Sequence, residues 1–91
     1  MTVKVRIPTQ LRPLSGGVSE VPVDGATVAD VLAALETAHP GFRDRLFDDT
    51  GALRRFVNVF VADEDIRFID GLATPVAAGT TVSIVPAVAG G

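Results

Sequence analysis

Residues 27–35 read TVADVLAAL, and their apolar side chains recur with the period of an α-helix. Four of these side chains are spaced i, i+3, i+4 and i+7 and therefore share one face of the helix: Val28, Val31, Leu32 and Leu35. Thr27 follows a turn signal and has Asp30 three positions on, which is typical of a helix N-cap. We expect the helix to end before Pro40, because the residue before a proline avoids helical geometry. The apolar face must then cover a sheet.

Two strands are predicted ahead of this helix. Residues 2–8 alternate apolar and basic side chains, which indicates a strand that is buried on one face. Residues 9–17 contain Pro13 and a pair of glycines, and we interpret them as a loop. Residues 18–23 form the second predicted strand, and Pro22 suits the edge of a sheet because it has no N–H to donate. The simplest arrangement pairs these two strands as a hairpin.

The strongest strand signal in the chain follows the helix, at residues 55–62. Large apolar side chains fall on both faces of this strand, so we expect it to be central in the sheet. The remaining segments predict, in order, a helical turn at 42–46, a turn at 48–51, an acidic turn at 63–65, a short returning strand at 66–68, a loop at 71–80 and a last strand at 81–86.

These segments together predict an α+β fold. Residues 1–86 form one domain with a mixed sheet of about four to five strands packed on one main helix, and residues 87–91 form a flexible C-terminal tail. A length of 91 residues fits one domain of this size. Since 47% of the residues are hydrophobic and only 5% are aromatic, we expect a core of aliphatic side chains.

The composition excludes several classes of function. A net charge of −3 with scattered basic residues does not fit a nucleic-acid binder, and no run is apolar or long enough for a membrane span. The absence of cysteine excludes disulfides, thiolate metal sites and a cysteine nucleophile. His39 is interpreted as favouring the negative end of the helix dipole or as facing solvent, and not as a general base. The acidic turn is interpreted as solvated and not as a metal site. Because residues 1–6 lack the apolar run of a signal peptide, we expect a cytoplasmic protein. Without a nucleophile motif or phosphate loop, we expect that it is not an enzyme.

The tail reads PAVAGG, residues 86–91, and ends on two glycines. Glycine has no Cβ, so this backbone can pass through a narrow channel in a partner. The five residues after Pro86 reach roughly 17 Å when fully extended. Such a tail is suited to placing the Gly91 carboxylate in an enzyme's active site.

Three stretches resemble one family. RFVNVFV at 55–61 with DEDIR at 63–67 is similar to the central hairpin of the ThiS/MoaD sulfur-carrier family. LATPV at 72–76 with GTTVSI at 79–84 resembles the loop and closing strand of that family, and PAVAGG is similar to the tail of the CysO-type carriers of actinobacteria. The resemblance covers essentially the whole chain and implies the β-grasp, or ubiquitin-like, fold.

Family membership implies a protein that carries activated sulfur. An E1-like adenylyltransferase of the MoeB/ThiF type would use ATP to adenylate the carboxylate of Gly91, and sulfur would then replace AMP to give a thiocarboxylate. The residues threaded into partners would be Ala87, Val88, Ala89 and Gly90. The acceptor would be a PLP-dependent cysteine synthase, with a metal-dependent peptidase releasing the product, or a thiazole or thiosugar synthase. ATP and PLP belong to partners, and the free carrier is expected to bind no cofactor or metal and to be a monomer.

The resemblance also implies an interface with the activating enzyme. Phe56, Phe60 and Ile66 are expected to leave an apolar patch on the sheet, although we expect at least one of the two phenylalanines to be in the core. Arg55 and Arg67, with Arg54, are expected at its rim, where they would steer an acidic partner surface. Two other functions stay open: a ubiquitin-like binding module or conjugated modifier, and the small subunit of a molybdopterin synthase.

Overall fold

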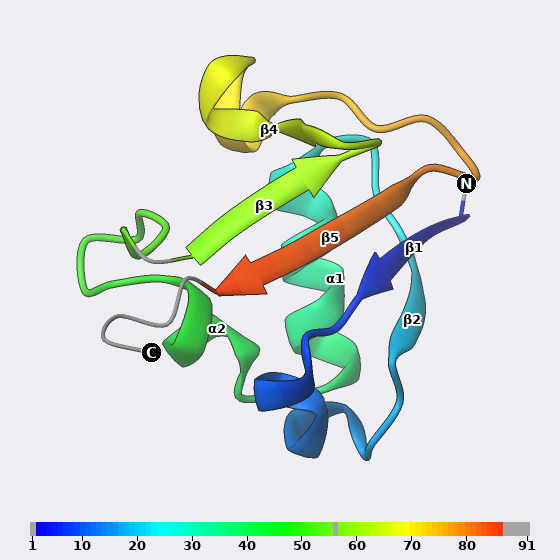
Figure 1. Cartoon of the computed structure of the whole chain (residues 1–91), viewed down its shortest axis with the longest axis vertical. Helices are drawn as coiled ribbons and strands as arrows, with labels where there is room; N and C mark the ends of the chain where they lie inside the picture. Colours follow the sequence, from blue (N-terminus) through cyan, green and yellow to red (C-terminus); the bar gives the residue numbers. More distant parts are fainter. Residues whose placement is uncertain (1, 56, 87–91) are drawn as a thin grey trace.

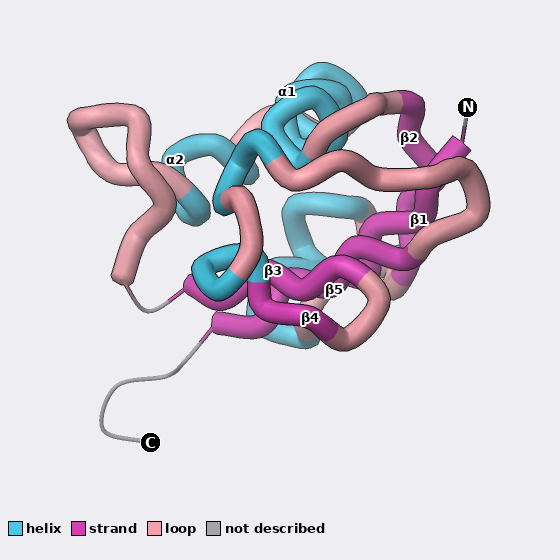
Figure 2. The backbone as a smooth tube through the Cα atoms, turned by 90° about the horizontal axis from the view of Figure 1, so that it is seen from above, coloured by secondary structure: helices cyan, strands magenta, loops and turns pink. Residues whose placement is uncertain are grey.

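Five strands form one mixed sheet, and a single long helix packs across one of its faces (Figure 1; Figure 2). The computed structural model describes residues 2–55 and 57–86. Its elements are β1 (Thr2–Arg6), the 3-10 helix η1 (Thr9–Ser15), β2 (Glu20–Asp24), α1 (Val28–Ala38), α2 (Phe42–Leu46), β3 (Val57–Val61), β4 (Glu64–Asp65), the 3-10 helices η2 (Ile66–Phe68) and η3 (Gly71–Ala73), and β5 (Thr81–Pro86). The predicted α+β arrangement of strands on one main helix is confirmed.

The sheet has the strand order β2-β1-β5-β3-β4. β1 and β2 form the predicted antiparallel hairpin, with Val3 opposite Val23 and Val5 opposite Val21. β5 runs parallel to β1 and antiparallel to β3, so the last strand is the central one. The prediction that residues 55–62 form the central strand is therefore wrong: β3 has β5 on one side, but only the two-residue β4 on the other.

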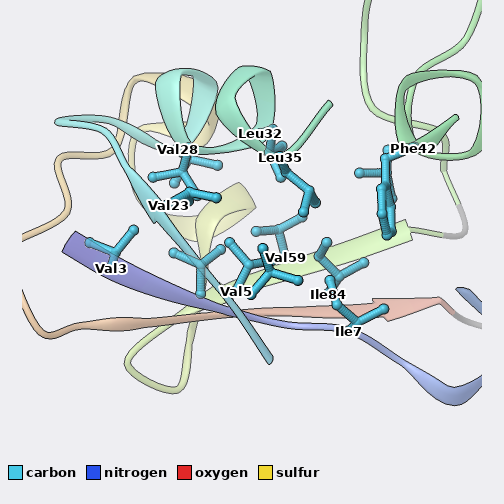
Figure 3. Close-up of a cluster of buried hydrophobic side chains, with 14 of the residues drawn as sticks. Val3, Val5, Ile7, Val23, Val28, Leu32, Leu35, Phe42, Val59 and Ile84 are labelled. Atoms are coloured by element: carbon cyan, nitrogen blue, oxygen red, sulfur yellow. The ribbon is translucent and has the colours of Figure 1, made fainter. Parts of the chain in front are cut away.

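The helix α1 begins and ends where its sequence pattern indicates. The Thr27 side chain accepts a hydrogen bond from the Asp30 N–H at 3.3 Å, and His39 caps the other end through its N–H to the Leu35 carbonyl. All four predicted apolar positions of α1 are buried against the inner face of the sheet. Figure 3 shows Val28, Leu32 and Leu35 of α1 above the strand residues Val3, Val5, Val59 and Ile84. Within residues 2–55 and 57–86, the buried hydrophobic side chains are thus aliphatic apart from Phe42.

The short helix α2 is held to α1 by one carboxylate. The side chain of Glu36 accepts hydrogen bonds from the N–H of Gly41 and the N–H of Arg43, both at 2.8 Å. These N–H groups lie at the start of α2, where no helical carbonyl is available to them. Gly41 has a φ of 115°, which favours glycine over residues with a Cβ. This arrangement places Phe42 in the core.

The turn predicted at residues 48–51 is present and is organised by the Asp48 carboxylate. Asp48 accepts hydrogen bonds from the Thr50 hydroxyl at 2.5 Å, the Thr50 N–H at 2.9 Å and the Ala52 N–H at 3.2 Å. The bond from the Thr50 hydroxyl is the main reason that the pKa of Asp48 lies below its usual value of 3.8. The lowered pKa favours the ionised carboxylate, which is the form that accepts these hydrogen bonds.

Two segments differ from the prediction. Residues 9–17 were expected to be a loop, but residues 9–15 form η1, with Pro13 inside it and the buried Ser15 hydroxyl donating to the carbonyls of Arg12 and Val18. The turn after β3 consists of Ala62 and Asp63, which both have positive φ, as in a two-residue type I′ hairpin turn. Residues 64–65 are therefore a strand, and the strand expected at 66–68 is the 3-10 helix η2.

Candidate functional site

The strand β5 ends at Pro86, the last residue before the tail. Pro86 lies opposite Val57, the first residue of β3, and Val85 lies opposite Asn58. The predicted tail residues Ala87, Val88, Ala89, Gly90 and Gly91 lie outside the described part of the chain, as does Phe56. The site that the structure describes is therefore the base of the tail, where β5 and the start of β3 meet.

The outer face of the sheet, opposite α1, surrounds this base. Residues that lie directly opposite each other on paired strands share a face, as do alternate residues along one strand. Phe60 lies opposite Ser83, and Asn58 lies opposite Val85, while the residues between them in β3 and β5 are buried on the α1 side. We call Asn58, Phe60, Ser83 and Val85 the outer-face patch. Phe60 is half-buried, and the Val85 side chain is 45% exposed.

The structure brings only some of the predicted interface residues together. Phe60 lies in the outer-face patch, and Arg55 is exposed just before β3. Arg67 is on η2, and its side chain reaches Asn58 at the margin of the patch. Ile66 is 1% exposed and belongs to the core, so its predicted place in an exposed patch is wrong.

The error at Ile66 has a simple geometric cause. A strand over 66–68 would place residues 66 and 68 on one face, but a 3-10 helix has three residues per turn and separates them. Ile66 consequently points into the core, whereas the Phe68 side chain is 89% exposed. The sequence analysis named neither Phe68 nor Val85 as an exposed apolar residue, although both are exposed. The alternating pattern of β5 indicated the exposure of Val85, because Val85 lies on the face opposite to the buried Val82 and Ile84.

Positive charge gathers beside the base of the tail. Arg54 donates from Nε and Nη2 to the carbonyl of Asp44, at 3.3 and 3.1 Å. Arg67 donates to three backbone carbonyls and to Asn58. Over residues 2–55 and 57–86, neither of these arginines nor Arg55 forms an ion pair with a carboxylate. Arg54 nevertheless interacts electrostatically with Asp48, whose pKa it helps to lower.

A separate pocket of about 420 Å³ lies on the helix side of the molecule. It is mainly apolar and is lined by Ala29, Leu32, Ala33, Glu36, Arg43, Phe47, Gly51 and Leu72. The Glu36 carboxylate at this pocket already accepts the two N–H groups at the start of α2. Because the pocket is formed by α1, α2 and η3, it is not part of the outer-face patch.

Two further classes of site were sought among residues 2–55 and 57–86. No group of histidine, aspartate and glutamate side chains there is arranged to hold a metal ion. No helix in this region has the length and apolar character needed to cross a membrane. What the outer-face patch offers chemically is an apolar surface with hydrogen-bonding side chains, which suits recognition of another protein.

Comparison with known proteins identifies the family. The pattern of the ThiS family matches residues 5–91. The sulfur carrier protein CysO of Mycobacterium tuberculosis is 50% identical over 93 residues, covering all of both chains. A chain in the crystal structure of the BexX/CysO complex of Amycolatopsis orientalis superposes with a TM-score of 0.91 at 47% identity, covering 98% of this chain and 99% of that one.

The archaeal small modifier proteins are also similar. The crystal structure of one from Haloferax volcanii has a TM-score of 0.86 at 33% identity, and each chain is fully covered. These likenesses confirm the β-grasp fold, in which the sheet wraps around α1. In the structure from Amycolatopsis orientalis, CysO is in complex with BexX. The chain belongs to the ThiS family and is a sulfur carrier of the CysO type.

Proposed function

We propose that the Gly91 carboxylate is the group that carries sulfur. An E1-like adenylyltransferase joins it to AMP with loss of pyrophosphate from ATP. Sulfide, or a donor equivalent to it, then attacks the acyl carbon: a C–S bond forms, the C–O bond to AMP breaks, and the thiocarboxylate remains. The single observation that carries this proposal is the end-to-end alignment with CysO, which includes residues 87–91.

The chain acts in this scheme as a co-substrate of its partners. Adenylation is needed because a carboxylate resists nucleophiles until it has a good leaving group. Holding the sulfur on a protein raises its effective concentration in the acceptor enzyme's active site. By analogy with CysO we assign a PLP-dependent cysteine synthase as the acceptor, with ATP and PLP bound by the partner enzymes. Since adenylation consumes ATP, we place the reaction in the cytoplasm.

The intact mass of the protein tests this function. After incubation with ATP, a sulfide source and an E1-like adenylyltransferase from the same organism, we expect a gain equal to the replacement of one oxygen by sulfur. Fragmentation should place the change at Gly91. An unchanged mass, with an activating enzyme that thiolates its own established carrier, would contradict the proposal.

We further propose that the outer-face patch docks the activating enzyme. The Phe60 and Val85 side chains would supply the apolar contact, and Arg55 with Arg67 would supply charge at its margin. This assignment keeps three of the predicted interface residues and replaces the buried Ile66 with Val85. Phe56 stays in the proposal from its sequence alone.

A matched pair of substitutions tests the docking surface. We expect Val85→Asp to raise the KM for the carrier in the adenylation reaction by about tenfold or more, because it puts a charge into an apolar contact. Val18→Asp is the control: Val18 is 48% exposed, close to the 45% of Val85, but it precedes β2, an edge strand that is separated from β5 by β1. Circular dichroism should show both variants folded. Equal KM values for the two variants would place the contact elsewhere.

A role as a protein modifier is the second candidate, because of the similarity to the archaeal small modifier proteins. In that case the Gly91 carboxylate would form isopeptide bonds with lysines of other proteins. Species of higher mass carrying this chain in cell extract would support it. Their absence, together with a mass gain from sulfur, would favour the carrier role alone.

A further inference from the structure

The guanidinium of Arg67 holds the segment that leads into β3. It donates to the Asn58 side-chain oxygen at 2.7 Å and to the carbonyls of Arg54, Arg55 and Val57 at 3.0, 3.2 and 2.8 Å. Three of its four acceptors are therefore backbone atoms within four consecutive residues. We call this set of bonds the Arg67 clamp.

Arg67 is itself held in place. Its N–H donates to the Asp65 side chain at 2.9 Å, which caps η2, and the neighbouring Ile66 is buried in the core. The guanidinium thus projects from a fixed turn toward β3. The clamp is a rigid link between η2 and the start of β3.

The start of β3 pairs with a strand on one side only among the described residues. β4 pairs only with Phe60 and Val61, so the first half of β3 has no neighbouring strand on that side within residues 2–55 and 57–86. On the other side, Val57 lies opposite Pro86, which has no N–H, and Val57 donates its own N–H to the Arg54 carbonyl. Val57 and Pro86 form a non-hydrogen-bonded pair, as every second pair of an antiparallel ladder does, because the Ala62 N–H bonds to the Thr81 carbonyl. The backbone groups of Val57 therefore face away from β5, on the side where the Arg67 guanidinium donates to the Val57 carbonyl in place of a neighbouring strand.

We propose that Arg67 is a positioning residue for sulfur transfer. By binding the carbonyls of Arg54, Arg55 and Val57, it fixes the strand end that lies beside Pro86 and therefore the point at which the tail joins the domain. Activation requires that an enzyme bind the outer-face patch and the carboxyl end of the tail at the same time. A shift at the base of the tail changes the distance between these two points. The inference rests on the proposed function of Gly91.

The clamp and a simple charge contact make different demands on residue 67. Arginine presents five N–H donors in a planar fork, whereas lysine presents a single ammonium group. Nη1 of Arg67 donates to Asn58, whereas the three carbonyls all lie around Nη2. Lysine keeps the positive charge but has only one side-chain nitrogen, so it cannot occupy both positions. Arg67→Lys therefore separates the clamp from electrostatic steering of a partner.

The test is the steady-state kinetics of adenylation by the activating enzyme, using the full chain. We expect Arg67→Ala and Arg67→Lys each to lower kcat/KM by about tenfold, mainly through KM, since misplacement at a distance from the chemistry costs this much or more. Arg45→Ala is the control for the loss of one positive charge. Arg45 is exposed on α2 and has no hydrogen bond or ion pair among the described residues.

The readouts distinguish the possible roles. With all variants folded at the assay temperature, wild-type kcat/KM in Arg67→Lys would overturn the clamp in favour of a charge contact. A lower melting temperature with unchanged kcat/KM would show that Arg67 has a purely structural role, and this result would also overturn the proposal. Amide exchange at Val57 and Val85 should be faster in both Arg67 variants. If Arg67→Ala does not fold, Arg67→Lys carries the test. Failure of the wild-type chain to gain sulfur would instead contradict the proposed function.

Discussion

Deleting Gly90 and Gly91 is expected to abolish thiocarboxylate formation and leave the fold intact. The deletion removes the carboxyl end that we propose is adenylated, and it shortens the reach of the tail by roughly 7 Å at about 3.4 Å per residue. Among the described residues the buried core runs from Val3 to Ile84, so we expect its packing to be unaffected. Intact mass after incubation with the activating enzyme should show no gain, and the free energy of unfolding should change by less than about 0.5 kcal/mol.

A variant of unchanged length is the control for this deletion. Replacing both glycines with alanine keeps the reach and the terminal carboxylate but adds a Cβ at each position. We expect this variant to be activated slowly, because the narrow passage is proposed to need glycine. A deletion variant that still gained sulfur would exclude Gly91 as the carrier residue.

Phe42→Ala is expected to have the largest effect on stability. The Phe42 side chain is 0% exposed and is the one aromatic member of the buried core cluster among the described residues. Truncating a buried phenylalanine typically costs about 3–5 kcal/mol, through lost burial and the cavity left behind. Small domains have about 5–15 kcal/mol of stability in total. Urea unfolding followed by circular dichroism should therefore show a variant near the limit of folding.

Phe68→Ala makes the same chemical change at the surface. Because Phe68 is 89% exposed, its removal should alter the free energy of unfolding by less than about 0.5 kcal/mol. Similar losses of stability in the two variants would mean that the core assignment of Phe42 is incorrect.

The parts of the fold that follow from sequence are those with a long repeated pattern. The apolar spacing of α1 and the alternation in β1 and β5 each extend over several residues, and the structure confirms them. Residues 66–68 are too few to distinguish a strand from a 3-10 turn, and Ile66 was misplaced for that reason. The central position of β5 depends on pairing between distant strands, which the pattern of a single strand does not contain.

The site could be predicted only in part. Phe60 and the arginines stand out in sequence because they are large or charged. The role of the Arg67 side chain does not, because three of its four acceptors are backbone carbonyls, which every residue possesses. Only the fold brings the carbonyls of residues 54, 55 and 57 to one side chain.

The parallel pairing of β1 with β5 has a consequence for the synthesis of the protein. Lys4 pairs with Thr81, so β1 cannot complete its pairing in the sheet until β5 has been synthesised. A nascent chain on the ribosome can form the β1–β2 hairpin and α1 early, but it lacks the strand between β1 and β3 until residue 86 has emerged. Chains interrupted before that point cannot complete the sheet and remain open to proteases. Translation through β5 is therefore a requirement for a folded carrier.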